Sequence, residues 1–542
     1  MCCIRGALLF VLFIMGCNPF DMVRTGADPD RKSGSQDGEI VDAGSSLDEQ
    51  YSFLPSPTRT RVVQGTTTTV PISIVRKGAS KGDISITLTG APPGVAAAPL
   101  TIPSASTTGQ LEIVVATTVS QGPMDVTIEG NAVNGKTSAS ESLPLFVRGP
   151  SGSLDTTFAV DGRLNAVFGE PAVPLDVFVQ ADDTILVLGA CSHQGTPKFD
   201  TCIARLTSEG ALDTTYGTGG IAILAGLYPS VGALLPDGGI VVGGRADGAA
   251  YGVIPTNGRN VGVVTPLGAT VLTPPAGLVG AIARAPDNHV VMVFDVTTTD
   301  AIRVMGIAKV TNAGALDAAF GTGGIETASF MGNDFSSGTV IAVRPNGKIV
   351  IVGEWSNAGN SGYGILQLDG SGTNDASFGM DDGQTLIRAD GLTRPGKLLL
   401  VPNGQVISTL DDGYGDYSVI AFTSGGNVDN TFGMGGMLPV SDDLGPQVFL
   451  DDQDRLLVTT GTLGALESVR RYTAAGITDT SFGRKGKVAL PLPAESLSVS
   501  SLADVASVAA RVQTDGRIVL LSGAIGSGAI NANLALVSRL WN

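Results

Sequence analysis

Gly210-Ala211-Leu212-Asp213-Thr214-Thr215-Tyr216-Gly217 carries a pattern, Gly-x-x-Asp-x-x-aromatic-Gly, that returns along most of the chain. A degenerate copy at Asn257-Gly258 has Val261 where the other copies have aspartate. The starting glycines follow one another at intervals of 48 to 58 residues. Such a period indicates an array of similar structural units. The full pattern starts at Gly210, Gly314, Gly372, Gly426 and Gly476, and a copy without the last glycine starts at Gly152.

A second motif, a turn that leads into an apolar strand, occurs once in each repeat. Pro236-Asp237-Gly238-Gly239-Ile240-Val241-Val242 is one copy, and Pro345-Asn346-Gly347-Lys348-Ile349-Val350 is another. Asp-Gly and Asn-Gly tolerate positive φ and favour tight turns between antiparallel strands. One apolar segment precedes this turn and one follows it, a further one comes after a short loop, and another follows the first motif. We therefore expect four strands in each repeat. Seven such repeats predict a seven-bladed β-propeller of four-stranded blades over residues 150–542, with an open solenoid as the alternative.

The two linked motifs resemble the delta-60 repeat family of bacterial surface proteins. The unit of that family reads Gly-Ser-Leu-Asp-x-x-Phe-Gly, followed by Pro-Asp-Gly-Lys-Ile-Val-Val-x-Gly. The resemblance covers residues 150–542, and it implies a propeller fold with no established activity. The third copy departs from the unit at Val261, so the resemblance does not predict the geometry of its turn.

The aspartate of the first motif recurs at one offset, which favours a structural role over a catalytic one. A carboxylate can accept backbone N–H bonds in a turn, and the aromatic residue three positions later can pack between blades. We therefore expect no catalytic residue among these positions. The six aspartates are Asp155, Asp213, Asp317, Asp375, Asp429 and Asp479.

Residues 51–149 have a different composition, rich in Thr, Val, Ile and Ser with alternating apolar and polar positions. This alternation predicts strands with one buried face. Five clear strands in about 100 residues predict an immunoglobulin-like β-sandwich. Pro144 in the last of them suggests an edge strand. The expected strands are 69–75, 83–89, 110–115, 124–129 and 143–147.

The N-terminal residues 1–16 have the pattern of a secretory signal. Arg5 precedes a nine-residue apolar run, too short to cross a bilayer as a helix. Ile14-Met15-Gly16-Cys17 resembles the bacterial lipobox, in which the cysteine is acylated after cleavage. The alternative is an ordinary secretion signal that contains a cysteine. Residues 17–50 are poor in large apolar residues and predict a flexible tether. Asn18 after the lipidated Cys17 favours the outer membrane or cell surface.

Two further cysteines, Cys191 and Cys202, lie at the end of one predicted strand and the start of its partner. In an exported protein this spacing predicts a disulfide, with two buried thiols as the alternative. His193 between them does not complete a zinc site, because a fourth ligand is missing. His289 replaces the usual residue of a turn and is expected to be solvated. Acidic clusters such as 451–454 keep a calcium ion possible, although we expect no cofactor and no metal site.

Composition narrows the function. The chain has 542 residues, a net charge of −17 and two histidines, which excludes a histidine-rich metal centre and argues against nucleic-acid partners. We expect a monomeric, lipid-anchored lipoprotein that displays a propeller for non-enzymatic binding or scaffolding at the cell envelope. Its partners would be the membrane, through the anchor, and an envelope protein or glycan. The alternatives are an extracellular polysaccharide hydrolase or lyase, and a structural component of a surface layer.

Overall fold

In the described residues of the computed structural model every regular element is a β-strand, which confirms the all-β expectation. Residues 49–542 pack as one compact unit. The expected signal peptide, Cys17 and nearly all of the tether lie outside the described residues. No helix of the described part is long and apolar enough to span a membrane. The described ranges are 50–54, 59–77, 82–132, 138–165, 167–168, 172–192, 199–267, 277–298, 300, 302–330, 335–357, 359–380, 382–389, 394–411, 416–440, 444–462, 466–491, 502–526 and 534–542.

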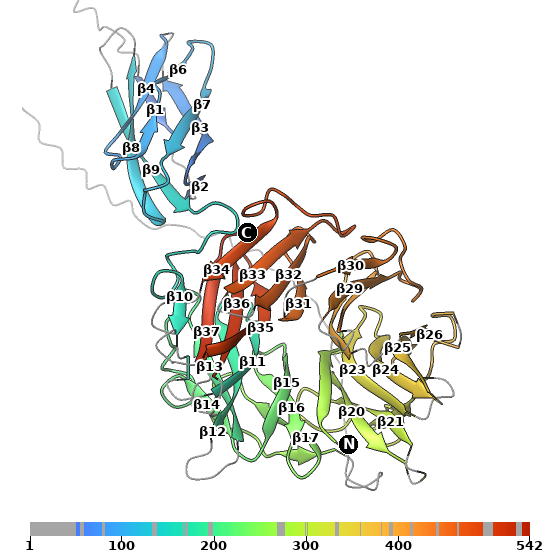
Figure 1. Ribbon diagram of the computed structural model, residues 1–542. Coiled ribbons are helices and arrows are strands. Elements are labelled where there is room, and N and C mark those ends of the chain that lie inside the picture. Colours follow the sequence, from blue (N-terminus) through green and yellow to red (C-terminus); the bar gives the residue numbers. More distant parts are fainter. Residues whose placement is uncertain are drawn as a thin grey trace, which may run out of the picture. The chain divides into compact units, whose positions relative to one another are not determined.

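The first nine strands form two sheets (Figure 1). One sheet has the order β1-β3-β7-β5 and the other the order β2-β9-β8-β4-β6. The bounds are β1 (Gln50–Phe53), β2 (Thr60–Val63), β3 (Thr66–Lys77), β4 (Ile84–Thr89), β5 (Val95–Ala97), β6 (Leu100–Ile102), β7 (Thr108–Val115), β8 (Gly122–Ala132) and β9 (Ser138–Arg148).

The two sheets share one apolar core, because alternate side chains of each strand turn inward. Leu111, Ile113 and Val115 of β7 are buried while their neighbours are exposed. They belong to the same buried cluster as residues of β4, β8 and β9 in the other sheet. The expectation that Pro144 marks an edge strand is wrong, since β9 lies between β2 and β8. The pairing with β2 begins at Leu145, so Pro144 precedes it and its missing N–H costs this ladder no bond.

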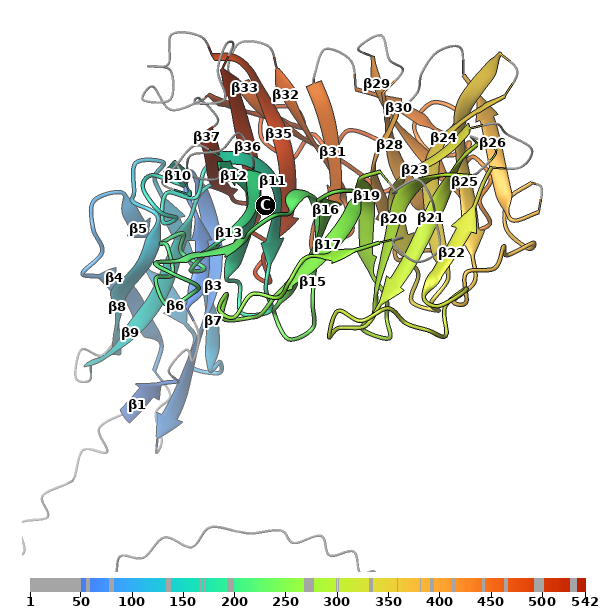
Figure 2. The same cartoon turned by 90° about the horizontal axis from the view of Figure 1, so that it is seen from below.

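The repeat region forms further antiparallel groups of four strands (Figure 2). Two groups join into one eight-stranded sheet through a single parallel pair, Arg303 with Phe335. The groups are β11 (Ala172–Val179), β12 (Ile185–Ser192), β13 (Phe199–Leu206) and β14 (Ile221–Leu224); β15 (Tyr228–Leu234), β16 (Ile240–Arg245), β17 (Ala249–Ile254) and β18 (Thr265–Pro266); β19 (Val279–Arg284), β20 (Val290–Thr297), β21 (Arg303–Val310) and β22 (Ile325–Ala328); β23 (Phe335–Val343), β24 (Ile349–Asn357), β25 (Asn360–Leu368) and β26 (Gln384–Arg388); β27 (Arg394–Leu400), β28 (Val406–Asp411), β29 (Tyr417–Phe422) and β30 (Met437–Pro439); β31 (Leu444–Leu450), β32 (Leu456–Thr462), β33 (Leu466–Tyr472) and β34 (Lys487–Pro491); and β35 (Leu502–Val512), β36 (Ile518–Gly526), β37 (Leu534–Leu540) and β10 (Arg163–Asn165).

The hairpin turn of each group has the geometry that its sequence predicts. The residue that needs a positive φ is glycine, asparagine or aspartate every time, as the tight-turn motif requires. The strands on both sides pair directly, for example Val343 with Ile349. The expected hairpin turns are therefore confirmed. The turn residues with positive φ are Asp183, Gly238, Asn288, Gly347, Gly404, Asp454 and Gly516.

The first strands of successive groups contact one another in a closed circuit. β11 contacts β15, and the contacts continue through β19, β23, β27, β31 and β35 back to β11. Each of these strands carries a β-bulge where it pairs with its second strand. A bulge bends a strand and increases its twist, so bulges at one level curve all these strands in the same way.

The last group is completed by a strand from the beginning of the repeat region. β10 pairs with β37 through Arg163 with Ser538, Leu164 with Val537 and Asn165 with Leu536. The group therefore combines residues about 370 positions apart in sequence. The backbone N–H of Asp155 also donates to the carbonyl of Arg539, which ties the first repeat motif to the final strand.

The aromatic residue of one repeat packs against the first glycine of the next. A Cβ added to Gly426 would lie 2.5 Å from the ring of Phe378. Gly379, which follows that phenylalanine, donates its N–H to the carbonyl of Gly425 at 2.7 Å. In the last repeat, Gly483 donates to Ser151 of the first, so the chain of contacts returns to its start. The same ring-to-glycine approach joins Phe158 with Gly210, Tyr216 with Gly258, Phe320 with Gly372 and Phe432 with Gly476.

The degenerate third copy replaces this contact by another. It has no aromatic residue in the motif, and its fourth strand, β18, is only two residues long. Tyr251 of β17 donates its hydroxyl to the carbonyl of Gly314 at 2.7 Å, and Val253 approaches the same glycine. A strand side chain thus reaches the next repeat where the motif does not.

Gly426→Ala tests the contact between repeats against a matched glycine. Gly435 has a similar backbone (φ +63° against +86°), but a Cβ there meets nothing within 4 Å. Both changes carry the cost of a side chain at positive φ, about 1 kcal/mol. Gly426→Ala also displaces the buried Phe378, which costs roughly another 1–3 kcal/mol. Urea unfolding of both variants measures the difference, and equal losses of free energy of unfolding would contradict the contact.

Candidate functional site

The repeated aspartate links the two sequence motifs within one group of strands. Asp375 Oδ1 accepts the backbone N–H of Ser377 at 3.2 Å and its hydroxyl at 2.6 Å. Oδ2 accepts Lys348 Nζ and Gln367 Nε2, each at 2.6 Å. Lys348 directly follows the Asn346-Gly347 turn, and Gln367 belongs to β25. One carboxylate therefore ties a turn, a hairpin and the third strand together.

The other five aspartates repeat this arrangement with different donors. Each accepts the N–H of the residue two positions later on Oδ1. The second oxygen has a cationic or amide neighbour in every copy. These neighbours are Arg517 and Arg539 for Asp155, Arg205 for Asp213, Lys309 and His289 for Asp317, Gln405 for Asp429, and Arg471 and Arg455 for Asp479.

These bonds lower the pKa of several of the carboxyl groups. The side-chain bond from Lys348, with that from Ser377, holds the pKa of Asp375 far below its usual range, although burial acts in the opposite direction. The hydroxyl of the residue two positions later is the main cause that lowers the pKa of Asp213, Asp429 and Asp479. The ionised carboxylate is thus the form that the folded chain stabilises.

The donors that follow each turn were not identified from the sequence. His289 is one of them, and it lies between two aspartates while its side chain stays partly exposed. Its Nε2 lies 3.6 Å from Asp317 Oδ2 and its Nδ1 lies 3.2 Å from Asp287 Oδ1, with the side chain about one quarter exposed. The sequence signal for this position is a long polar residue directly after the Asn-Gly or Asp-Gly pair, as at Lys348, Gln405 and Arg517.

Cys191 at the end of β12 and Cys202 in β13 are joined by a disulfide, with their Cα atoms 5.9 Å apart. The register pairs Gly189 with Cys202 and Cys191 with Asp200, so the bridge runs diagonally across neighbouring strands. It covalently links β12 to β13. His193 lies outside the described residues.

No group of three potential metal-ligating side chains is found in the described part of the chain. Asp451 is buried and accepts the N–H groups of Gln453 and Arg455 as well as Arg455 Nε. It therefore caps a turn. Large parts of the clusters at 411–416 and 442–443 lie outside the described residues.

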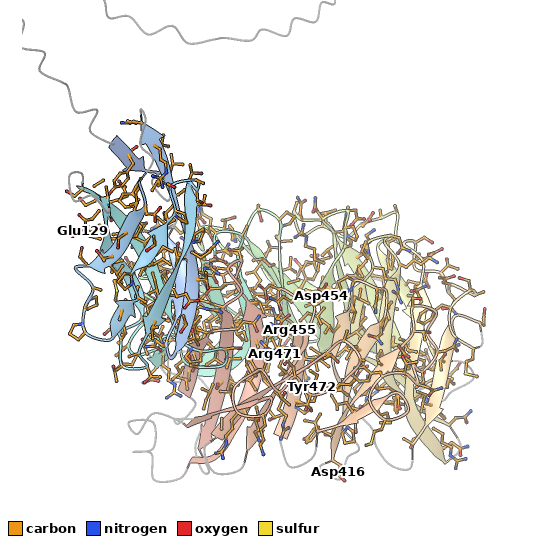
Figure 3. All side chains as sticks on the ribbon, turned by 90° about the horizontal axis from the view of Figure 1, so that it is seen from above. Glu129, Asp416, Asp454, Arg455, Arg471 and Tyr472 are labelled. Carbon is orange, nitrogen blue, oxygen red and sulfur yellow. A yellow bond between two sulfur atoms is a disulfide. The ribbon has the colours of Figure 1, made fainter. Side chains whose placement is uncertain are left out.

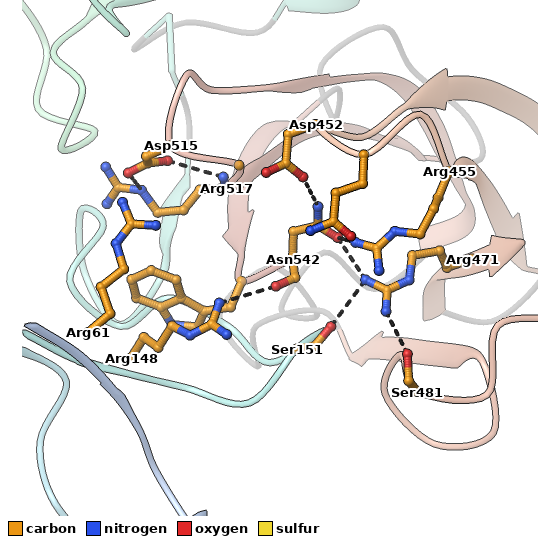
Figure 4. A pocket seen from close by; sticks show the side chains of 13 residues that line it. Arg61, Arg148, Ser151, Asp452, Arg455, Arg471, Ser481, Asp515, Arg517 and Asn542 are labelled. Carbon is orange, nitrogen blue, oxygen red and sulfur yellow. Dashed lines mark hydrogen bonds and ion pairs between the residues drawn. The ribbon is translucent and has the colours of Figure 1, made fainter. Parts of the chain in front are cut away.

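A cavity of about 450 Å³ is lined by residues of the two-sheet region and of the repeat region (Figure 4). Arg61 of β2 and Arg148 of β9 enter from the two-sheet region. Arg455, Arg471 and Arg517 enter from the repeat region. Arg455 and Arg471 lie beside each other at the ends of neighbouring strands (Figure 3). None of these five arginines was expected from the sequence to share a site.

The three repeat-region arginines have carboxylate partners. Arg471 Nε lies 2.8 Å from Asp479 Oδ2, and Arg455 Nε lies 2.6 Å from Asp451 Oδ2. Arg517 Nε lies 2.7 Å from Asp515 Oδ2. Burial lowers the pKa of Arg471, helped by the nearby charge of Arg455, and Asp479 opposes this shift.

Arg61 and Arg148 differ from these three, because no Asp or Glu side chain of the described residues forms an ion pair with either of them. Arg148 Nη1 donates to the backbone carbonyl of Asn542 at 3.4 Å. Arg61 is exposed and makes no hydrogen bond or ion pair with any described residue. Burial lowers the pKa of Arg148, and the positive charge of Arg61 lowers it further. Two guanidinium groups without an Asp or Glu ion-pair partner among the described residues therefore line one cavity, beside Asp452 and Asp515.

The closed circuit of first strands holds a second charged cluster. Asp176 of β11 is buried, and its Oδ1 lies 3.0 Å from Arg511 Nη2 of β35. Its Oδ2 lies 3.8 Å from Lys397 Nζ of β27, a strand that is not adjacent to β11 in the circuit. The carboxylate thus has a cation on each oxygen.

Comparison with known proteins bears on the repeat region. A family model described as "Domain of unknown function (DUF5122) beta-propeller" matches residues 180–216 and 344–378. The repeat region is a β-propeller. No curated protein matches the chain. Among solved structures, an endo-arabinase from Bacteroides thetaiotaomicron VPI-5482 is 10% identical and superposes with a TM-score of 0.26, over 61% of this chain and 96% of that one. A likeness this low assigns neither fold nor activity.

Asp375→Asn tests the electrostatic part of the propeller turns. We expect a loss of roughly 1–3 kcal/mol near neutral pH, because charge-assisted bonds to Lys348 and Gln367 weaken. The folded pKa lies below the unfolded value of about 3.9. The stability from this group is therefore fully present above the unfolded pKa and is lost as the pH falls from there through the folded pKa.

Urea unfolding at a series of pH values from about 6 down to about 2.5 measures this effect. The variant should show a flatter decline than the wild type below about pH 4.5. Asp161→Asn, at an exposed position, is the control and should retain the wild-type slope. An unchanged slope in Asp375→Asn would contradict the role of its carboxylate.

Proposed function

We propose that this protein is an exported lipoprotein whose propeller binds an envelope partner without chemical turnover. The observation that carries this proposal is the bonding of the repeated aspartates. Each accepts turn and side-chain donors, so the acidic residues that dominate the repeat serve the architecture and not acid–base chemistry. The arginine-lined cavity supplies binding groups of the opposite charge.

The domain arrangement is part of the proposal. Residues 51–149 are an immunoglobulin-like sandwich, and residues 150–542 are a seven-bladed propeller of the delta-60 repeat type. The closed circuit of first strands and the pairing of β10 with β37 support a closed ring over an open solenoid. β10, from the beginning of the repeat region, completes the last blade by pairing with β37. This pairing joins the two ends of the ring, so that neither end exposes an unpaired strand edge.

The enzyme alternative has less support. A glycoside hydrolase uses two carboxyl groups, one of them protonated at working pH. The buried carboxylate of Asp176 has Arg511 and Lys397 as partners. These ion pairs join three of the first strands, β11, β27 and β35, so this carboxylate serves to hold the ring together.

Attachment to the membrane rests on the sequence of residues 1–17. We propose that Cys17 is acylated and that the tether of residues 17–50 holds the compact unit at the outer membrane or cell surface. The net charge of −17 keeps the displayed protein away from nucleic acid and from anionic lipid surfaces. The protein acts as a monomer with no resident cofactor.

Cys17→Ser tests the anchor. The serine hydroxyl cannot receive the thioether-linked lipid, so we expect loss of labelling by radioactive palmitate and loss of membrane retention. Cys3→Ser is the matched control, because Cys3 lies within the signal and should not affect either readout. Labelling of the Cys17→Ser protein would overturn the anchor.

A thermal-shift screen with calcium, polysaccharides and peptidoglycan fragments tests the binding role. A ligand that binds only the folded state raises the melting temperature in a saturable way. We expect such a shift from at least one envelope glycan, with no shortened product when the same glycan is analysed by chromatography after long incubation. Release of shorter products would replace the binding role by an enzymatic one.

A further inference from the structure

The five arginines of the cavity fall into two classes according to their ion-pair partners. Arg455, Arg471 and Arg517 each have a carboxylate within 2.8 Å, so their charges are largely balanced inside the protein. Arg61 and Arg148 have no Asp or Glu partner among the described residues; the one contact of Arg148 is the main-chain oxygen of Asn542 at 3.4 Å. They come from strands β2 and β9, which pair directly. Two like charges held on neighbouring strands repel each other, and an anion between them relieves that cost.

The chemistry of these two groups points to an oxyanion. A guanidinium presents several N–H donors in a plane and binds carboxylate or sulfate in a two-pronged manner. In Figure 4 Arg61 has no bond to any of the residues drawn, and Arg148 has one contact, to Asn542. Most of their donors are therefore free for a ligand in the cavity.

The remaining lining of the cavity is polar and suits a ligand rich in hydroxyl groups. Asp452, Gln453 and Asn542 provide both donors and acceptors beside the arginines. The volume of about 450 Å³ accommodates a group of the size of one or two sugar rings. A neighbouring cavity of about 460 Å³ shares Arg61, Asp515, Arg517 and Trp541 with the first.

We propose that this cavity binds the acidic sugar units of an extracellular polysaccharide, with Arg61 and Arg148 gripping the carboxylate or sulfate group of one sugar. The inference rests on the proposed binding role and adds the ligand class and the residues. The three paired arginines position the polar lining, and Arg61 and Arg148 contact the anion. In a chain with a net charge of −17, this local positive charge also selects where an acidic polymer can dock.

Isothermal titration of the full-length protein in detergent with three probes tests the proposal. The probes are oligogalacturonate, a sulfated oligosaccharide and a neutral cello-oligosaccharide of equal length. We expect saturable binding of at least one acidic probe, no binding of the neutral one, and weaker binding as the salt concentration rises. Binding of oligogalacturonate would identify a carboxylate as the recognised group, and binding of the sulfated oligosaccharide would identify a sulfate.

Arg61→Gln and Arg148→Gln locate the site. Loss of one charge-assisted contact should weaken the acidic probe by about 10- to 100-fold in either variant. Arg245→Gln, at an exposed arginine of β16 outside the cavity, is the matched control and should bind as the wild type does. Because Arg61 is exposed, Arg61→Gln keeps the experiment valid even if Arg148→Gln disturbs folding.

Three outcomes would overturn the inference: no saturable binding of either acidic probe, equal binding of the neutral probe, or wild-type affinity in both variants. Binding of inorganic sulfate alone, without the sugars, would also overturn the sugar assignment. Failure of the inference differs from failure of the proposed function. A different envelope ligand found in the thermal-shift screen keeps the binding role and removes this site, whereas cleavage of a bound acidic sugar keeps the site and removes the non-enzymatic role.

Discussion

The contact between the aromatic residue of one repeat and the first glycine of the next is the constraint on which the propeller depends. At Phe378 and Gly426 the ring occupies the space that a Cβ would need, so both residue types are required together. The aspartate three positions before the ring fixes the turn by accepting an N–H bond and a hydroxyl bond. Local turn chemistry thereby becomes packing between neighbouring sheets, and repetition carries it around the molecule.

The contact between repeats can be replaced by other contacts, as the third repeat and the junction between the last and the first repeat show. Where the motif loses its aspartate and aromatic residue, Tyr251 makes the link to Gly314 from a strand. Where the chain returns to its start, Gly483 donates to Ser151, and β10 completes the sheet of β37. A ring shares its stability among many similar contacts, so a single degenerate unit can be accommodated when a neighbouring side chain takes over the contact.

The arginine cavity has a different origin from the repeats. Its residues come from β2 and β9, from a turn before β32, from β33 and from the last residues of the chain. The repeat aspartates balance some of these arginines as part of the architecture, as Asp479 does for Arg471. The arginines from the two-sheet region lie outside that repeated network, and their charges are consequently available. The cavity thus lies where a repeated module meets a unique one.

The sequence alone was sufficient for the all-β class, the positions of the hairpin turns and the propeller, because these follow from short-range chemistry repeated many times. Asn-Gly and Asp-Gly pairs determine backbone conformation locally, and alternating apolar residues determine which face is buried. The tertiary structure alone decided the partners of each aspartate, the place of β10 in the last sheet and the gathering of Arg61, Arg148 and Arg471. The partners of Asp155, the place of β10 and the gathering of the arginines join residues hundreds of positions apart, whereas the other aspartates have partners within the same repeat. No local propensity encodes which side chains will face one another. The same reason explains the error at Pro144: the sequence shows that this residue lacks an N–H donor, but only the register of β2 shows that the pairing begins after it and that no bond of that ladder is lost.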